Sequence, residues 1–117
     1  MFRNILVPTD GSALSLKAIK GAAQLAREQK ARLTGVHVVP PYDPGMRDEG
    51  SVLRYLSPQD YTARSRAVAQ KRLATVGKAA AAAGVRCELV HASGSFPFEE
   101  ILRVAQRKKC DLIYMAS

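Results

Sequence analysis

The residues best suited to chemistry stand near the N-terminus, in the segment 9–12 (Thr-Asp-Gly-Ser). The segment follows the apolar run 5–7, which is typical of a strand buried on both faces of a parallel sheet. Pro8 cannot donate a backbone hydrogen bond and marks the end of that strand. Residues 13–29 then have helical spacing. Asp10 is therefore expected at the C-terminal tip of a strand, where ligands bind in open α/β sheets.

The same residues also fit a purely structural role. Aspartate and serine are both preferred at the N-cap of a helix, so Asp10 and Ser12 are candidate caps for the helix that follows. The residue types and their spacing leave two interpretations of Asp10 open, a helix cap and a ligand contact.

No other group of residues forms a catalytic constellation. His37 and His91 have no carboxylate or thiolate partner at metal-binding spacing, and we interpret them as packed or edge histidines of strands. Ser93 and Ser95 flank Gly94 without making a nucleophile elbow. The sequence contains neither a P-loop nor a G-x-G-x-x-G motif. We therefore expect a binding protein and not an enzyme.

The elements that must position these residues alternate along the chain. We expect four strands at 4–8, 32–39, 85–91 and 111–116, and three helices at 13–29, 58–83 and 97–109. The last helix has an apolar stripe formed by Phe98, Ile101, Leu102 and Ala105, and helix 58–83 has a narrow one formed by Val68, Leu73 and Val76. Strands separated by helices predict a parallel sheet with right-handed crossovers and helices on both faces. The long connection 40–57 is a candidate lid. Its tyrosines Tyr42 and Tyr55, and Tyr61 just beyond it, could stack on a base or anchor packing.

Length and composition narrow the class of protein. A chain of 117 residues suits one domain. It has no signal peptide and no apolar run of about 18 residues that could span a membrane, so a cytoplasmic location is the default. Cys87 and Cys110 are expected to be free, buried thiols. The net charge of +8 is spread over the helices, and we favour a solvated basic surface over nucleic-acid binding.

Three segments together resemble the universal stress protein family. They are NILVPTDGS at the start of the chain, GVHVV at 35–39, and GSFPFEEILRVAQRKKCDLIYMAS at the end. The resemblance implies an open, doubly wound parallel sheet of the flavodoxin or Rossmann type, with strand order 3-2-1-4. The family's fifth strand and last helix would lie beyond Ser117, so residues 1–117 are expected to form a single domain that is incomplete at its C-terminus.

The resemblance also implies a ligand. Many members of the family bind ATP or AMP where the winding of the sheet reverses, and Mg²⁺ can accompany ATP. Carried over, Asp10 lies near the adenosine, and the backbone of Val38 recognises the adenine edge. Residues 115–117 begin the glycine-rich phosphate loop, although Ala116 stands where a glycine is typical. The implied nucleotide-binding residues are Pro8, Thr9, Asp10, Val38, Met115, Ala116 and Ser117.

The functional prediction follows from this resemblance. We expect an adenine-nucleotide-binding module that regulates or protects in a stress response, and a homodimer when the protein is intact. The alternative is a family member that binds no nucleotide and acts through contacts with unknown protein partners. We expect no membrane partner.

Overall fold

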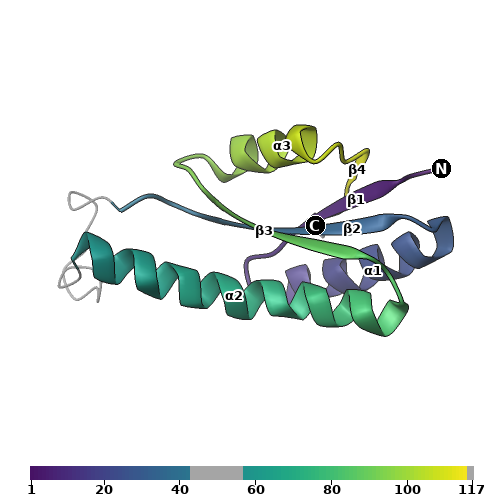
Figure 1. Cartoon of the computed structure of the whole chain (residues 1–117), viewed down its shortest axis with the longest axis horizontal. Helices are drawn as coiled ribbons and strands as arrows, with labels where there is room; N and C mark the ends of the chain where they lie inside the picture. The colour runs from purple at the N-terminus through teal and green to yellow at the C-terminus, as the bar shows by residue number, and fades with distance from the viewer. Residues whose placement is uncertain (43–56, 116–117) are drawn as a thin grey trace.

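The computed structural model describes residues 1–42 and 57–115, and these build a parallel four-stranded sheet with helices on both faces (Figure 1). The elements are β1 (Asn4–Pro8), α1 (Ala13–Gln29), β2 (Arg32–Val39), α2 (Pro58–Ala83), β3 (Cys87–Ser93), α3 (Pro97–Arg107) and β4 (Leu112–Ile113). The strand order β3-β2-β1-β4 confirms the predicted 3-2-1-4 sheet. Helices α1 and α2 lie together on one face and α3 lies on the other (Figure 1).

Two strands differ from the sequence-based prediction. Strand β3 begins at Cys87 and not at residue 85, because the N–H of Val85 still donates to Ala80 O and completes the end of α2. Strand β4 covers only Leu112–Ile113, since its ladder to β1 consists of two residue pairs. The second half of the predicted fourth strand is therefore not strand within the described residues.

Local signals set the ends of the two long helices. Ser12 is the N-cap of α1, where its side-chain oxygen accepts the N–H of Ser15 at 3.1 Å. Helix α2 begins with Ser57 as N-cap followed by Pro58, and it ends at Gly84 with φ of 68°. This left-handed conformation suits glycine because it has no Cβ.

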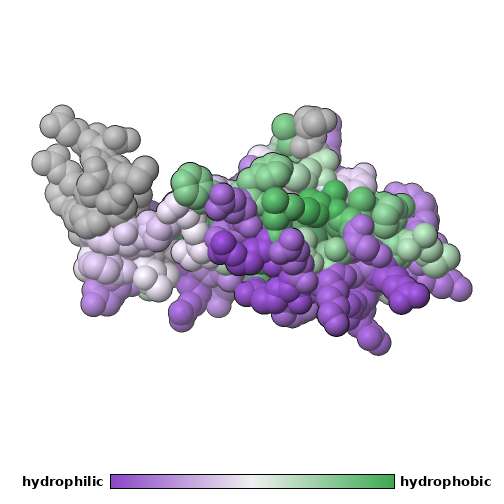
Figure 2. All heavy atoms as spheres, turned by 90° about the horizontal axis from the view of Figure 1, so that it is seen from above, coloured by the Kyte–Doolittle hydropathy of each residue, from purple (hydrophilic) through white to green (hydrophobic). Residues whose placement is uncertain are grey.

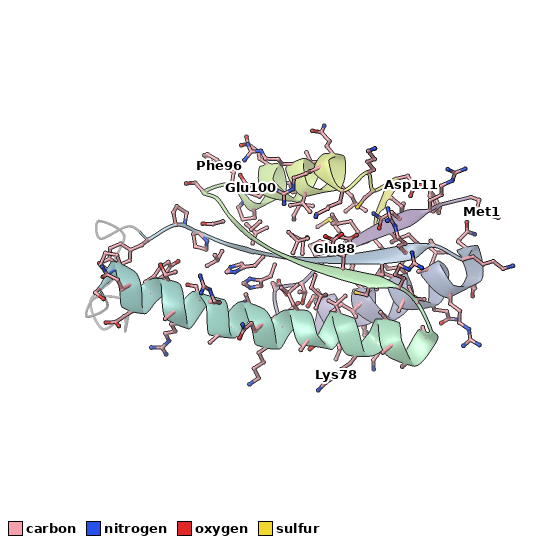
Figure 3. All side chains as sticks on the ribbon, viewed as in Figure 1. Met1, Lys78, Glu88, Phe96, Glu100 and Asp111 are labelled. Atoms are coloured by element: carbon pink, nitrogen blue, oxygen red, sulfur yellow. The ribbon has the colours of Figure 1, made fainter. Side chains whose placement is uncertain are left out.

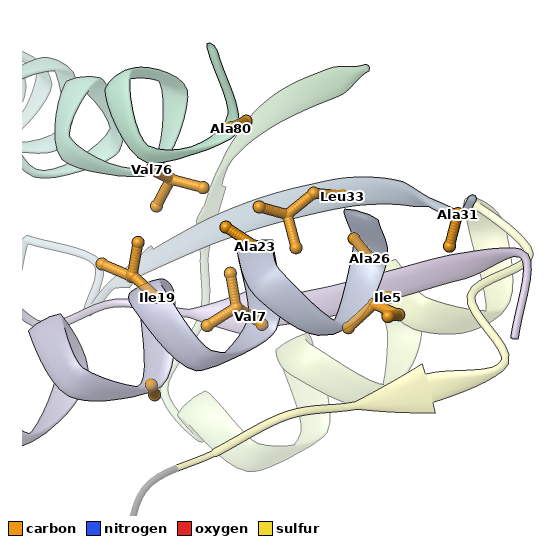
Figure 4. Packing of buried hydrophobic residues seen from close by; sticks show 11 residues of the cluster. Ile5, Val7, Ile19, Ala23, Ala26, Ala31, Leu33, Val76 and Ala80 are labelled. Atoms are coloured by element: carbon orange, nitrogen blue, oxygen red, sulfur yellow. The ribbon is translucent and has the colours of Figure 1, made fainter. Parts of the chain in front are cut away.

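The larger core lies between the sheet and the pair α1 and α2 (Figure 4). Side chains of a strand alternate between faces, so Ile5 and Val7 point into this core while Leu6 points to the opposite one. Small side chains on α1, including Ala22 and Ala26, are fully buried and let the helix lie close to the sheet.

The smaller core lies under α3, and here the predicted apolar stripe was partly wrong. Helix α3 buries Ile101 and Val104, whereas Phe98 and Leu102 are 65% and 45% exposed. A stripe defined by i, i+3 and i+4 spacing is wider than the strip of surface that one helix buries on an open sheet. The sequence pattern therefore overestimated what α3 covers.

The predicted thiols are free, as expected, but only half-buried. Cys87 lies in β3, and Cys110 comes just before β4, at the opposite edge of the sheet. Burial raises the pKa of both thiols.

None of the helices in the described part of the chain has the length and apolar character needed to span a membrane.

Candidate functional site

A crevice with a volume of about 410 Å³ opens at the C-terminal ends of β1 and β2, between the first turns of α1 and α3. Strand β1 lies between β2 and β4, so the winding of the sheet reverses beside it, which is the usual ligand position in such folds. The predicted site residues that line this crevice are Pro8, Thr9, Asp10, Val38 and Met115. The other two predicted residues, Ala116 and Ser117, lie outside the described residues.

The loop from β1 to α1 holds its shape through its own hydrogen bonds. Thr9 is buried, and its N–H donates to Val36 O at 2.9 Å, which extends the pairing of β1 with β2. Its hydroxyl lies 3.4 Å from the N–H of Gly11 and 3.4 Å from the hydroxyl of Ser15. Gly11 has φ of 83°, a conformation that a residue with a Cβ rarely adopts. The loop is therefore ordered before any ligand arrives.

Asp10 is not the N-cap of α1, since Ser12 takes that role. Its Oδ1 accepts the N–H of Ser12 at 2.8 Å, and the side chain is exposed at the mouth of the crevice. Hydrogen bonds from the Ser12 hydroxyl and backbone N–H lower the pKa of the Asp10 carboxyl below its usual range. At neutral pH the crevice thus carries a fixed negative charge that can accept hydrogen bonds from a ligand's hydroxyl groups.

The remaining walls of the crevice are mainly apolar. Val36 and Val38 form its floor on β2, Ile101 of α3 forms one side, and the half-exposed side chains of Leu14 and Met115 flank the opening. Seen from the α3 side, apolar surface extends across the middle of the molecule and is bordered by hydrophilic side chains (Figure 2). Apolar walls with a few polar groups at one end are typical of sites for small organic ligands.

Several crevice residues were missed by the sequence analysis. Ser15 contributes a hydroxyl one helical turn after Ser12, and Pro97 and Ile101 approach from α3. The position of Ser15 could have been found from the i, i+3 spacing on α1. The approach of α3 could not, because it depends on which face of the sheet that helix covers.

Other candidates from the sequence lie outside the crevice. His37 and His91 lie beside each other, with ring centroids 5.8 Å apart, and His37 also contacts Arg72 of α2. The rings of Tyr42 and Tyr61 lie beside each other, with centroids 5.5 Å apart, and the hydroxyl of Tyr61 donates a hydrogen bond to Pro40 O. The tyrosines are therefore not base-stacking groups of this crevice. Tyr55 and most of the predicted lid lie outside the described residues.

The described part of the site is suited to binding a ligand. The crevice lining contains no lysine, arginine, histidine or cysteine among the residues that the structure describes. Within those residues, no group of three potential metal ligands gathers anywhere. The crevice as described suits an uncharged, partly apolar group with hydroxyls, while the charged part of a larger ligand would extend beyond it.

Comparison with known proteins establishes the family. The profile of the universal stress protein family matches residues 1–117, and the chain belongs to that family. It is 33% identical to the universal stress protein MJ0531 of Methanocaldococcus jannaschii and spans 65% of its length. It is 32% identical to the universal stress protein YxiE of Bacillus subtilis and spans 80% of that protein. Both comparisons cover the whole of this chain.

Solved structures show the same fold. A universal stress protein from Burkholderia pseudomallei superimposes with a TM-score of 0.78 and 26% identity, covering 97% of this chain and 80% of that one. A universal stress protein in complex with cAMP has a TM-score of 0.68 and 24% identity, over 96% of this chain and 70% of the other. One from Archaeoglobus fulgidus in complex with dAMP has a TM-score of 0.66 and 19% identity, over 95% and 78% respectively.

Proposed function

We propose that the protein binds an adenine nucleotide, ATP or AMP, with the adenosine in the crevice, and that it acts as a regulatory or protective module and not as a catalyst. The observation that carries the proposal is the convergence of Asp10, Val38 and Met115 on one hollow at the reversal point of the sheet. Membership of the family and the cAMP- and dAMP-bound structures of its relatives support the choice of an adenine ligand.

Each part of the crevice has a role in this proposal. The valines of β2 and Met115 enclose the flat adenine ring, and the backbone of Val38 meets its polar edge. Asp10, ionised and held by Ser12, accepts hydrogen bonds from the ribose hydroxyls. The phosphates extend past Met115 and out of the described crevice. Magnesium would arrive bound to the phosphates of ATP, since the described crevice offers a single carboxylate.

A non-catalytic role is part of the same proposal. Hydrolysis of ATP needs a positioned water and charge stabilisation around the γ-phosphate. The described crevice lining provides one acid at the adenosine end and no basic side chain. We therefore propose that the nucleotide is a ligand that changes the state of the protein and is released unaltered.

Calorimetric titration with adenosine, AMP and ATP tests this proposal. We expect micromolar binding and at least a tenfold weakening by Asp10→Asn, which removes the charge and keeps the shape. Glu28→Gln is the matched control, because it removes one exposed negative charge from α1 outside the crevice. Adenosine should retain most of the affinity of AMP for residues 1–117. Absence of saturable binding, or equal weakening by both variants, would contradict the proposal.

A second candidate function rests on the outer surface of α3. Phe96, the N-cap of α3, is 66% exposed, and Phe98 and Leu102 of the helix are 65% and 45% exposed. Neighbouring exposed side chains that are large and apolar are a typical protein-binding feature. In this alternative the protein binds no nucleotide and acts through protein contacts. Retention of a partner by the wild-type chain but not by Phe98→Ser, with no saturable binding of AMP to either, would favour it.

The proposal includes a cytoplasmic location, and also a homodimer, which the family resemblance implies. Sedimentation equilibrium measures the oligomeric state of the intact protein. A monomer at every protein concentration, with and without AMP, would contradict the proposed homodimer.

A further inference from the structure

A second hollow, here called the α2 pocket, lies on the opposite face of the sheet from α3. It has a volume of about 240 Å³ and opens between the C-terminal end of β2 and the first half of α2. The residues that matter for its chemistry are His37, Pro40, Tyr61, Ser65, Val68 and Arg72. The pocket is separate from the crevice, with Val38 of β2 between the two.

Arg72 gives the α2 pocket a positive charge at one end. Its Nη1 lies 3.1 Å from Nε2 of His37, and no carboxylate forms a salt bridge with it among the described residues. Its side chain also lies against Gly11: a Cβ built at that glycine would be 2.8 Å from Arg72 Nε. A second arginine, Arg64, lines the same pocket and likewise has no ion pair in the described part of the chain. Within the described residues, the two guanidinium groups have no negative partner.

His37, which lines the α2 pocket, has a buried ring nitrogen that no described residue pairs with. The residue is 4% exposed, and its Nδ1 is buried without a hydrogen-bond partner among the described residues. Because arginine can only donate, Nε2 of His37 accepts from Arg72 and the proton of the neutral ring resides on Nδ1. Burial, with Arg72 and His91 nearby, lowers the pKa of His37 and keeps this ring neutral at pH 7. A buried N–H without an acceptor is costly, and native proteins seldom retain one.

The other walls of the α2 pocket restrict the class of ligand. Pro40, Val68 and the ring of Tyr61 are apolar, and Ser65 adds one hydroxyl. The volume lies below the range of about 300–1,000 Å³ that is usual for sites of drug-sized ligands, so the pocket suits a molecule smaller than a nucleotide. A small molecule with an apolar body and one oxyanion group matches both the walls and the charge.

We propose that the α2 pocket binds a small organic anion, either a carboxylic acid or a phosphate monoester, whose oxyanion pairs with Arg72 and whose apolar body packs on Val68, Pro40 and Tyr61. The guanidinium provides a bidentate donor pair, and His37 holds it in position by accepting its third N–H. The site does not depend on nucleotide binding in the crevice.

Amide chemical shifts of the ¹⁵N-labelled protein, titrated with phenyl phosphate, benzoate and inorganic phosphate, test the proposal. We expect saturable shifts at Val39, Ser65 and Arg72 with at least one of the two aromatic anions, and at least tenfold weaker binding of inorganic phosphate. Whichever of benzoate and phenyl phosphate binds more tightly identifies the head group. Shifts that grow linearly with every anion would overturn the proposal.

Two matched pairs of variants keep the test specific. Arg72→Gln should weaken binding at least tenfold, whereas Lys78→Gln, which removes the same charge from the face of α2 turned away from the sheet, should leave it unchanged (Figure 3). Ser65→Leu should fill the pocket and abolish binding, while Ala74→Leu adds the same side chain at an exposed position of the helix. Equal effects within either pair would overturn the proposal.

A competition experiment separates this site from the crevice. Saturating AMP should leave the affinity for the aromatic anion within twofold, and Asp10→Asn should do the same. Displacement of the anion by AMP would place the probe in the crevice and overturn the inference, whether or not the proposed nucleotide function holds.

Discussion

The two faces of the sheet are built differently, and the difference explains where binding is expected. On the α1 and α2 face, eleven described residues form a continuous buried cluster in which short side chains bring the helices close. On the α3 face, six described residues are buried under one helix, and large apolar side chains beside them remain exposed. The first face is mainly a stabilising core, and the second combines a smaller core with the crevice.

The α2 pocket shows that even the closed face opens at its end. Helix α2 has 26 residues and β2 has eight, and His37 near the end of β2 contacts Arg72 near the middle of α2, where these polar groups replace apolar packing. The core of that face is continuous around Val76 and Ala80, further along the same helix. On this face, buried apolar packing therefore lies toward the C-terminus of α2, and the polar groups lie toward the C-terminal ends of the strands.

The largest expected effect on stability comes from replacing two neighbouring residues of β1 whose side chains point to opposite faces of the sheet. Ile5 and Leu6 are both 0% exposed, one in each core. We expect Ile5→Ala and Leu6→Ala each to lower the free energy of unfolding by about 2–5 kcal/mol, with the larger loss for Ile5. The cavity left by Ile5 lies within the larger buried cluster, whereas the thinner layer over Leu6 can relax. Urea denaturation measures both, and a larger loss for Leu6 would reverse the comparison.

The α3 face also contains a buried polar connection. Asn4 is 2% exposed, accepts the hydroxyl of Thr34 at 2.9 Å and donates to Lys108 O at 3.0 Å. Asn4→Ala would remove the partner of the buried Thr34 hydroxyl and of the part-buried Lys108 carbonyl, so we expect a loss of about 1–3 kcal/mol. The double variant with Thr34→Val, measured by the same denaturation, should recover part of that loss. Equal stabilities of the single and double variants would show that the hydroxyl is not left unsatisfied.

The pH dependence of stability distinguishes the His37 region from the apolar core. The pKa of His37 is lowered in the folded state, mainly by burial, so the unfolded chain binds more protons as pH falls through its unperturbed value near 6.5. The free energy of unfolding should therefore decrease between pH 7.5 and pH 5. Denaturation curves for His37→Gln should show a weaker decrease over the same window, and an unchanged slope would exclude His37 as its source.

The smallest expected effect concerns the ends of the two helices on one face. Helix α1 ends at Lys30 with φ of 55°, while α2 ends at a glycine in the same left-handed region. Lys30→Gly should raise the free energy of unfolding by up to about 1 kcal/mol, because relief of backbone strain exceeds the entropy cost of glycine. Thermal unfolding measures the change, and Lys20→Gly in the helix interior, which should destabilise, is the control.

Much of the fold could be predicted from local features. Ser57, Pro58 and Gly84 mark both ends of α2, and the alternation of strands and helices is sufficient to predict a parallel sheet. The apolar stripe of α3 was less reliable, because periodicity identifies the apolar side of a helix but not how much of it a neighbour covers. The same limitation applies to Val68, which belongs to the predicted stripe of α2 and is 38% exposed.

In the candidate site, too, the local features could be predicted and the long-range contacts could not. The amino-acid sequence by itself determined the turn at Thr9 to Ser12, the strand before it and the helix after it, because caps, proline and glycine act over a few residues. It also carried the resemblance that the family comparison confirmed. Only the tertiary structure decided that Met115 and Ile101 lie beside Asp10, and that Arg72 contacts His37, 35 positions earlier in the chain. These contacts depend on strand order and on which helix covers which face, and both are properties of the packed molecule.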